Sequence, residues 1–174
     1  ALQLSLMTMR RLKTLLLVAC AFFLHAPANA QIQVVGDGGP GPVKAQHLTV
    51  ELVTQSANIA PGGTLQAGLA FTLDEQWHVY WINAGDSGEP PHVTWTLPPG
   101  ITAGPMQFPI PHRLPLGPLM DFGYQHDVAF PIQLTAAPGT KIGPIHLDAK
   151  IDWLVCREVC IPGKAHLGLN LTVA

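Results

Sequence analysis

Prolines and glycines interrupt this chain so often that long helices are excluded. The sequence holds 17 prolines and 17 glycines in 174 residues, and the stretches between turn signals are roughly ten residues long. No window shows a sustained 3.6-residue period or a capping box, whereas stretches such as His47–Val53 alternate apolar and polar residues. We therefore expect an all-β fold, a single immunoglobulin-like antiparallel β-sandwich of about seven to nine strands.

Alternation and turn residues locate the expected strands. They cover residues 47–53, 64–73, 77–83, 92–97, 127–135, 145–153 and 165–173. In residues 77–83, side chains alternate between the two faces of the sheet. Trp77, Val79 and Trp81 are therefore expected on one face, and His78 and Tyr80 on the other.

Two loops of the expected sandwich are candidates for function. Residues 101–120 contain five prolines, and a long irregular loop inside a compact domain is often functional. A second loop, residues 84–91, contains Ser87, but no Gly-x-Ser-x-Gly elbow surrounds it, so a hydrolase is not favoured. Asp86 and Glu89 in that loop are expected to be solvated turn residues.

The N-terminal residues are typical of an export signal. Arg10, Arg11 and Lys13 precede an apolar run from Leu15 to Leu24, which is too short to span a bilayer as a helix. Ala28-Asn29-Ala30 then supplies a signal-peptidase site and predicts Gln31 as the mature start. The predicted organisation is upstream residues and signal peptide over 1–30, a flexible leader over 31–43 and the sandwich over 44–174.

An alternative end for the signal is a lipidated cysteine. Leu17-Val18-Ala19-Cys20 fits a lipobox, in which Cys20 becomes the first residue. The apolar run continues beyond Cys20, and this favours cleavage after Ala30.

The charge of the exported chain argues against nucleic acid as a partner. The signal removes three of the nine basic residues and none of the eleven acidic ones, which leaves six against eleven and a net charge of −5. There is no basic patch to neutralise phosphates. Export also places cysteines in a compartment where thiols can oxidise.

Cys156 and Cys160 are the only cysteines outside the signal. They flank an expected reversal between two strands, where their Cα atoms would lie close enough for a disulfide. A loop of about five residues stabilises a fold by only ~2 kcal/mol in the chain-entropy model, against ~4.7 kcal/mol for a hundred-residue loop. This spacing favours a redox-active pair, while a local structural disulfide and a metal site remain alternatives.

The metal alternative is a copper site. Two thiolates favour Cu(I), and the candidate third ligands are His112, His126 and His166. There is no His-x-x-His and no second cysteine pair, so structural zinc is not favoured.

Five motifs follow one another in a fixed order along residues 44–174. They are Trp-x-x-Tyr-Trp-x-Asn-x-Gly-Asp-Ser-Gly from Trp77 to Gly88, Pro90-Pro91 with Trp95, Leu-Pro-x-Gly ending at Gly100, Phe-Gly-Tyr ending at Tyr124, and Cys-x-x-x-Cys-Ile-Pro-Gly from Cys156 to Gly163. This set resembles the N-terminal periplasmic domain of DsbD-type thiol:disulfide interchange proteins, especially the branch that includes the ScsB copper-tolerance proteins.

The resemblance implies an immunoglobulin-like domain that relays electrons as part of a protein-disulfide reductase, without a cofactor. In the family, electrons arrive from a cytoplasmic thioredoxin through a membrane-embedded segment and pass to periplasmic acceptors. Carried over, Cys156 and Cys160 would be the exchanging pair, and Cys160 would form the mixed disulfides. Expected partners are periplasmic thioredoxin-fold proteins and a membrane-embedded electron donor, on the same or a separate chain. The implied location is the periplasm, and the implied processes are cytochrome c biogenesis and copper tolerance.

The family also has a cap loop with an aromatic tip that shields the cysteines. Residues 106–113 occupy the equivalent place in the chain order, so Phe108 is the expected covering side chain. Tyr80, Tyr124 and Arg157 are expected to border the site. Arg157 would favour a thiolate and the neighbouring Glu158 would oppose it.

Overall fold

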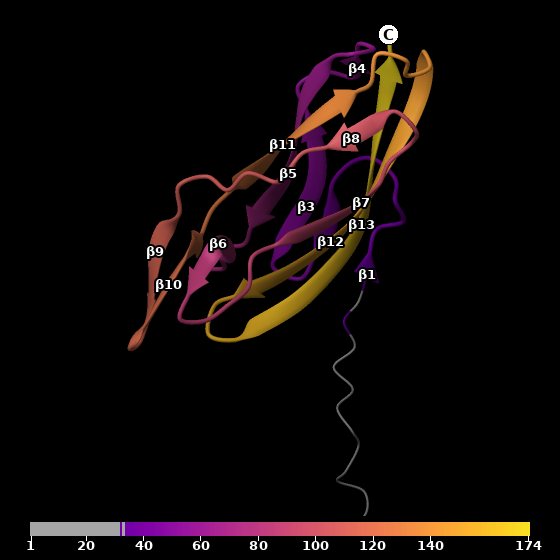
Figure 1. The fold of residues 1–174 in the computed structure, drawn as a ribbon. Helices are drawn as coiled ribbons and strands as arrows, with labels where there is room; N and C mark the ends of the chain where they lie inside the picture. The colour runs from indigo at the N-terminus through magenta and orange to yellow at the C-terminus, as the bar shows by residue number, and fades with distance from the viewer. Residues whose placement is uncertain (1–31, 33) are drawn as a thin grey trace, which may run out of the picture. The chain divides into compact units, whose positions relative to one another are not determined.

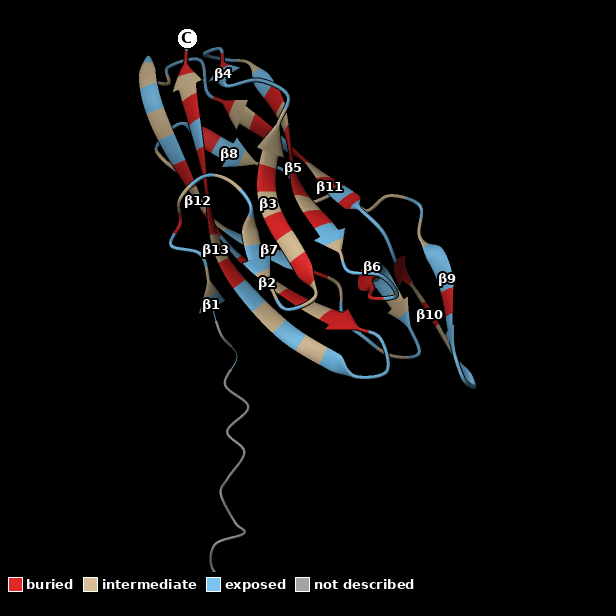
Figure 2. Cartoon of the chain, turned by 180° about the vertical axis from the view of Figure 1, so that it is seen from behind, coloured by how far each residue is buried: buried red, intermediate tan, exposed pale blue. Residues whose placement is uncertain are grey.

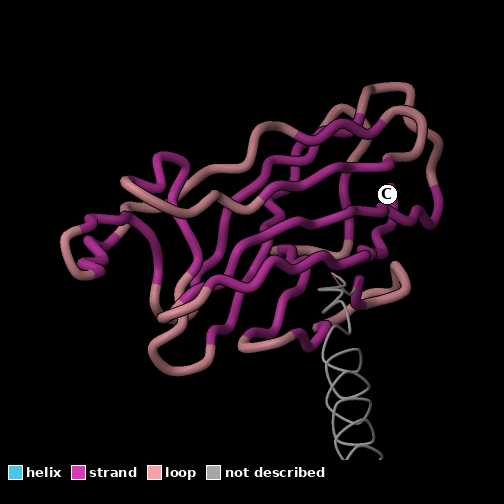
Figure 3. The backbone as a smooth tube through the Cα atoms, turned by 90° about the horizontal axis from the view of Figure 1, so that it is seen from below, coloured by secondary structure: helices cyan, strands magenta, loops and turns pink. Residues whose placement is uncertain are grey.

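The computed structural model describes residue 32 and residues 34–174, so the predicted signal peptide and Cys20 lie outside the described residues. The regular elements of this part are all strands (Figure 1, Figure 3). They are β1 (Val34–Val35), β2 (Val43–Ala45), β3 (Leu48–Thr54), β4 (Asn58–Ile59), β5 (Thr64–Leu73), β6 (Val79–Gly85), β7 (His92–Thr96), β8 (Ile101–Ala103), β9 (His112–Leu116), β10 (Leu119–Tyr124), β11 (Val128–Ala136), β12 (Gly143–Cys156) and β13 (Cys160–Val173). In this part of the chain, no helix could cross a membrane.

Two five-stranded sheets form the layers of a sandwich. One has the order β1-β13-β12-β7, with β4 also paired to β13, and the other has the order β2-β3-β5-β11-β8. Side chains of both sheets share one hydrophobic core, in which the rings of Phe71 (β5) and Trp153 (β12) meet edge-on at 5.9 Å. The expected all-β, immunoglobulin-like sandwich is therefore confirmed, although β1 and β4 pair with β13 in parallel.

Alternation along the strands produces this core, as strand β11 illustrates. Val128, Phe130, Ile132, Leu134 and Ala136 are buried, and the residues between them are not. Successive side chains of a strand point to opposite faces, so every second residue enters the core. Figure 2 shows the resulting bands of buried and exposed residues along the strands. Burying a side chain the size of Phe130 contributes about 1.5–3 kcal/mol.

A third, three-stranded sheet of order β6-β10-β9 adjoins the sandwich. It was not expected, because residues 101–120 were predicted to be an irregular loop. Within that stretch, residues 104–111 and the two turn residues Gly117 and Pro118 lack strand structure, and β9 and β10 form a hairpin about this turn. Pro115 is tolerated in β9 because this is an edge strand, where a missing N–H need not break a ladder. The described residues contain thirteen strands, including short ones such as β8, whereas the sequence predicted about seven to nine.

The predicted leader is also part of the domain. Val34 and Val35 pair with Lys164 and Ala165 of β13, and Gly38 N–H donates to a β13 carbonyl at 3.1 Å. The compact unit accordingly begins at Ile32 rather than at residue 44. Glycines at positive φ in this stretch allow the chain to follow β13 without a strand-like sequence pattern.

Candidate functional site

The two cysteines close the longest hairpin of the fold. Strands β12 and β13 are in antiparallel register over fourteen residue pairs, and the last pair is Cys156 and Cys160. On the other side of β12, Cys156 N–H donates to the carbonyl of His78 at 3.0 Å, and His78 N–H donates to the carbonyl of Cys156 at 2.9 Å. The Cys156 backbone therefore bonds away from β13, which makes the cysteines a non-hydrogen-bonded pair, the closer type of cross-strand neighbour. Their Cα atoms lie 4.1 Å apart, slightly closer than the ~4.4–6.8 Å that is usual for a disulfide. The two sulfurs form a disulfide.

The Ile-Pro-Gly tail of the motif lies inside β13, not before it as expected. Pro162 faces Leu154 in the register, two pairs from the cysteines, so its missing N–H would point away from β12. On that outer side, β1 pairs with β13 only from Lys164 onward, and an unpaired edge tolerates proline. Gly163 is required because a Cβ there would lie 2.3 Å from the Trp153 ring.

The two cysteines differ in accessibility. Cys156 is 1% exposed and lies between Cys160 on one side and His78 on the other, whereas Cys160 is exposed. A disulfide is exchanged by attack of a thiolate on one of its sulfurs, so the reachable sulfur determines where a partner can react.

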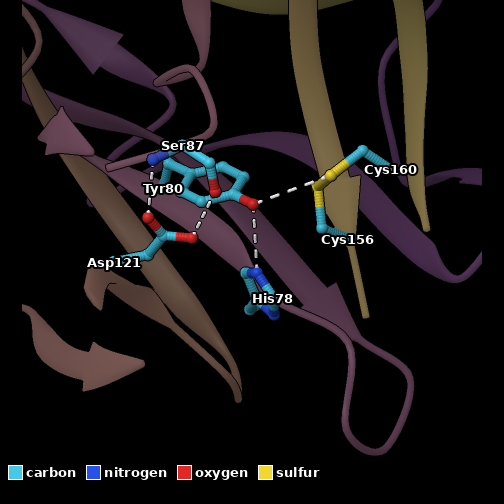
Figure 4. Close-up of a disulfide and its surroundings, with 6 residues drawn as sticks. All are labelled: His78, Tyr80, Ser87, Asp121, Cys156 and Cys160. Atoms are coloured by element: carbon cyan, nitrogen blue, oxygen red, sulfur yellow. Dashed lines mark hydrogen bonds between the residues drawn. A yellow bond between two sulfur atoms is a disulfide. The ribbon is translucent and has the colours of Figure 1, made fainter. Parts of the chain in front are cut away.

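Tyr80 and His78 lie against the disulfide from strand β6 and the residue before it (Figure 4). The Tyr80 hydroxyl is 3.7 Å from Cys160 Sγ and 3.2 Å from His78 Nε2. Burial lowers the pKa of His78, and the nearby Asp121 acts in the opposite direction. Burial also raises the pKa of Tyr80, Asp121 adds to this rise and Ser87 opposes it. The site therefore holds a protonated phenol at neutral pH.

A buried carboxylate supports Tyr80 from the third sheet. Asp121 of β10 is 1% exposed and accepts hydrogen bonds from Ser87 N–H at 2.8 Å and from the Ser87 hydroxyl at 2.6 Å. Asp86, expected to be a solvated turn residue, accepts a hydrogen bond from Met120 N–H at 2.8 Å. These bonds hold residues 85–88 over the Tyr80 ring, where a Cβ at Gly88 would lie 2.2 Å from the ring.

Arg157 lies in the turn between the cysteines and contacts an aromatic ring. Its guanidinium carbon is 5.7 Å from the centre of the Trp77 ring, and His47 stacks on the same indole at 3.7 Å between ring centres. Cation–π contacts of this kind stabilise by about 0.5–1 kcal/mol at exposed sites. Arg157 therefore fastens the cysteine turn to Trp77, one residue before His78.

The other predicted border and cap residues have core partners. The Tyr124 hydroxyl donates to the carbonyl of Pro109 at 2.7 Å, and burial raises the pKa of Tyr124 to about 12. Phe108 packs against Phe130 at 5.1 Å between ring centres and is partly buried beside the core. The shielding role of Phe108 stays a prediction, and the aromatic group that the structure brings to the sulfur is Tyr80.

The predicted copper ligands are dispersed over the fold. His112 lies in β9, His126 in the turn after β10, and His166 in β13, where it pairs with Asp148. In residues 32 and 34–174, no group of three or more His, Cys, Asp or Glu side chains is placed to hold a metal ion.

Sequence reasoning missed His78, Asp121 and the structural role of Ser87. The alternation of residues 77–83 did place His78 and Tyr80 on one face of a strand. It did not indicate that the disulfide lies next to that face. Asp121 gave no signal, because its place depends on the pairing of β10 with β6, including a register shift between Asp121 and Gly123.

Comparison with solved structures finds chains of similar fold. The N-terminal periplasmic domain of ScsB from Proteus mirabilis has a TM-score of 0.58 and 23% identity, over 75% of this chain and 49% of that one. The chain thus spans about half the length of the ScsB domain it matches. The GAE domain of yeast GGA1 has a TM-score of 0.39 and 10% identity, over 81% of this chain and 98% of that one. No curated protein matches in sequence.

A family comparison covers most of the domain. The family model for the N-terminal part of the thiol:disulfide interchange protein DsbD matches residues 45–172. This range includes the third sheet, the β12–β13 hairpin and both cysteines of the disulfide. The chain therefore belongs to the family of DsbD N-terminal domains of thiol:disulfide interchange proteins.

Proposed function

We propose that this domain passes reducing equivalents to partner proteins through reversible opening of the Cys156–Cys160 disulfide. The observation that carries the proposal is the unequal exposure of the pair, with Cys156 1% exposed and Cys160 exposed. A structural disulfide gains nothing from one accessible sulfur, whereas an exchanging disulfide needs one. Family membership supports the same chemistry.

The reaction is a balanced two-electron exchange. When the domain is reduced by a donor dithiol, a donor thiolate attacks Cys160 Sγ, the Cys156–Cys160 bond breaks, and its electron pair goes to Cys156 Sγ, which takes up a proton. The second donor thiolate then attacks the donor sulfur of the mixed disulfide and releases Cys160 as a thiolate. The donor ends as a disulfide and the domain as a dithiol. The same steps in reverse reduce an acceptor disulfide, and Cys160 then makes the attack.

The proposed partners are thioredoxin-fold proteins and a membrane-embedded electron donor, and the proposed compartment is the periplasm. The predicted signal within residues 1–30 supports export. Intact-mass analysis of the exported protein tests this point. A chain beginning at Gln31 is expected, and one that begins with a lipidated Cys20 would contradict it.

A redox titration tests the exchange itself. We would equilibrate the protein in glutathione and dithiothreitol buffers, count thiols by mass and follow folding by circular dichroism. The expected midpoint lies above about −300 mV, the region below which structural disulfides of exported proteins fall. The reduced domain should stay folded, since the short loop contributes only ~2 kcal/mol. Resistance to reduction below that potential, or unfolding on reduction, contradicts the proposal.

A matched pair of variants tests which sulfur reacts. Cys156→Ala leaves the exposed Cys160, which should capture a thioredoxin-fold protein as a mixed disulfide. Cys160→Ala leaves only the buried Cys156 and should capture little. Equal capture by both variants would contradict the assignment, and tight Cu(I) binding by the reduced protein without exchange would favour the copper alternative.

A further inference from the structure

A tyrosine hydroxyl lies beside the reactive sulfur of Cys160, and the exchange steps of the two cysteines do not require it. We infer that Tyr80 is a catalytic group of the exchange site, whose hydroxyl donates a hydrogen bond to Cys160 Sγ and stabilises the Cys160 thiolate, and that His78 positions this hydroxyl. This inference rests on the proposed function and adds two residues to it.

The Tyr80 ring has little freedom to move. It is 0% exposed and lies under Gly88, where even a Cβ would come within 2.2 Å of it. Ser87, next to Gly88, is fixed to Asp121 through two hydrogen bonds. The 3.7 Å separation between the hydroxyl and Cys160 Sγ is therefore set by packing, so the donor is in place before a thiolate forms.

His78 determines the direction in which the hydroxyl donates. A phenol carries one hydrogen. Tyr80 lies 3.2 Å from His78 Nε2, so it can donate to the sulfur when Nε2 carries the imidazole hydrogen and donates to the Tyr80 oxygen. The His78 backbone is tied to Cys156 in both directions, which fixes this imidazole relative to the disulfide.

The charges around Tyr80 keep it a donor. Asp121 on β10 is the carboxylate whose charge acts on both Tyr80 and His78. Together with burial it raises the pKa of Tyr80, so the phenol keeps its hydrogen at neutral pH. Arg157, the cation of the cysteine turn, packs on the Trp77 ring and is not among the groups that shift the pKa of Tyr80.

The Cys160 thiolate takes part in the reaction with a partner protein in both directions of electron flow. Cys160 leaves the mixed disulfide as a thiolate when the domain is reduced, and attacks as a thiolate when the domain reduces an acceptor. A hydrogen bond to an anion is stronger than one to a neutral sulfur. Tyr80 therefore favours the thiolate over the thiol, and no proton needs to leave the phenol.

The experiment measures the pH profile of Cys160 alkylation by iodoacetamide. It uses the full chain with Cys156→Ala under reducing conditions, and mass spectrometry of the peptide that contains Cys160. Adding Tyr80→Phe removes only the hydroxyl and should raise the midpoint of the profile by about one pH unit or more, which is about a tenfold lower rate below the midpoint. His78→Phe should shift the midpoint in the same direction by less, and adding it to Tyr80→Phe should cause no further shift, because His78 acts through Tyr80.

Tyr124→Phe is the matched control, since the Tyr124 hydroxyl donates to Pro109 instead. It should leave the midpoint unchanged. An unchanged midpoint in Tyr80→Phe, or an equal shift in Tyr124→Phe, overturns the inference. Additive shifts of Tyr80→Phe and His78→Phe overturn the positioning role of His78. None of these measurements needs a partner protein, so the inference can fail while the disulfide still exchanges, and a disulfide that resists reduction removes the proposed function instead.

Discussion

The two large sheets and the region around the small sheet β6-β10-β9 bury different kinds of side chain. The facing sides of the large sheets bury apolar residues. In the part of the chain that the structure describes, the buried polar or charged side chains are His78 and Asp121, which lie next to β6 and in β10. His78 bonds to Tyr80, whose hydroxyl lies next to the disulfide, and Asp121 bonds to Ser87 beside Tyr80 (Figure 4). The apolar layers therefore supply stability, and the region beside them holds the groups that can do chemistry.

The polar region is not a defect in the packing. Among the described residues, every buried side-chain nitrogen or oxygen has a hydrogen-bond partner. A buried polar group costs free energy mainly when it is left unpaired. Asp121 is paired with Ser87, and His78 with Tyr80, so the fold can hold a fixed polar site beside its core.

The largest expected effect comes from the apolar side of this comparison. Phe130 is fully buried and contacts the rings of Phe71, Phe108 and Tyr124. Phe130→Ala should lower the free energy of unfolding by about 3–5 kcal/mol, because a large apolar side chain is lost and a cavity remains. Urea denaturation measures this loss.

The same variant should leave Cys160 alkylation in the folded, reduced protein unchanged. Ile110→Ala, at a side chain that is 92% exposed, is the control and should change stability by less than about 0.5 kcal/mol. If Phe130→Ala alters the Cys160 profile while the protein is folded, the division between core and site is wrong. Phe130→Leu serves where the alanine variant does not fold.

A pair of glycines tests how tightly the small-sheet region is packed. Gly88 and Gly117 both have positive φ, but a Cβ at Gly88 meets the Tyr80 ring while a Cβ at Gly117 meets nothing within 4 Å. Alanine at either position costs about 1–2 kcal/mol, because a residue with a Cβ is strained at positive φ. Gly88→Ala should cost about 1–3 kcal/mol more, because it overpacks the site. Urea denaturation of both variants gives the difference, and equal losses would mean that the loop over Tyr80 moves freely.

The smallest expected effect is a pH dependence from His78. Its pKa is lowered in the folded state, so the unfolded chain binds more protons near the unperturbed value, and stability falls as pH falls through about 6.5. One proton of difference changes the free energy of unfolding by at most about 1.4 kcal/mol per pH unit. Urea denaturation at pH 7.5 and 5.5 should therefore show a larger loss in the natural protein than in His78→Gln. Parallel pH profiles of the two proteins would argue against a buried neutral imidazole.

Much of the fold could be predicted because its signals are local. Alternation identified most strands of the two large sheets, and the spacing of Cys156 and Cys160 across a turn predicted a pair close enough to bond. Motif order over residues 44–174 indicated the family that the comparison then confirmed. Local signals failed where pairing partners decide the structure. The prolines of residues 101–120 concealed β9 and β10, and the glycines of the leader concealed its attachment to β13.

The sequence by itself determined that the chain forms a β-sandwich with two cysteines at a hairpin turn, because side-chain period, turn residues and short-range spacing act between near neighbours in the chain. Only the tertiary structure decided which cysteine is exposed and what touches it. Tyr80 and Cys160 are 80 residues apart, and Ser87 and Asp121 are 34 residues apart. Strand pairing brings them together, and the burial that results decides that Cys160 faces the solvent with a tyrosine hydroxyl beside its sulfur.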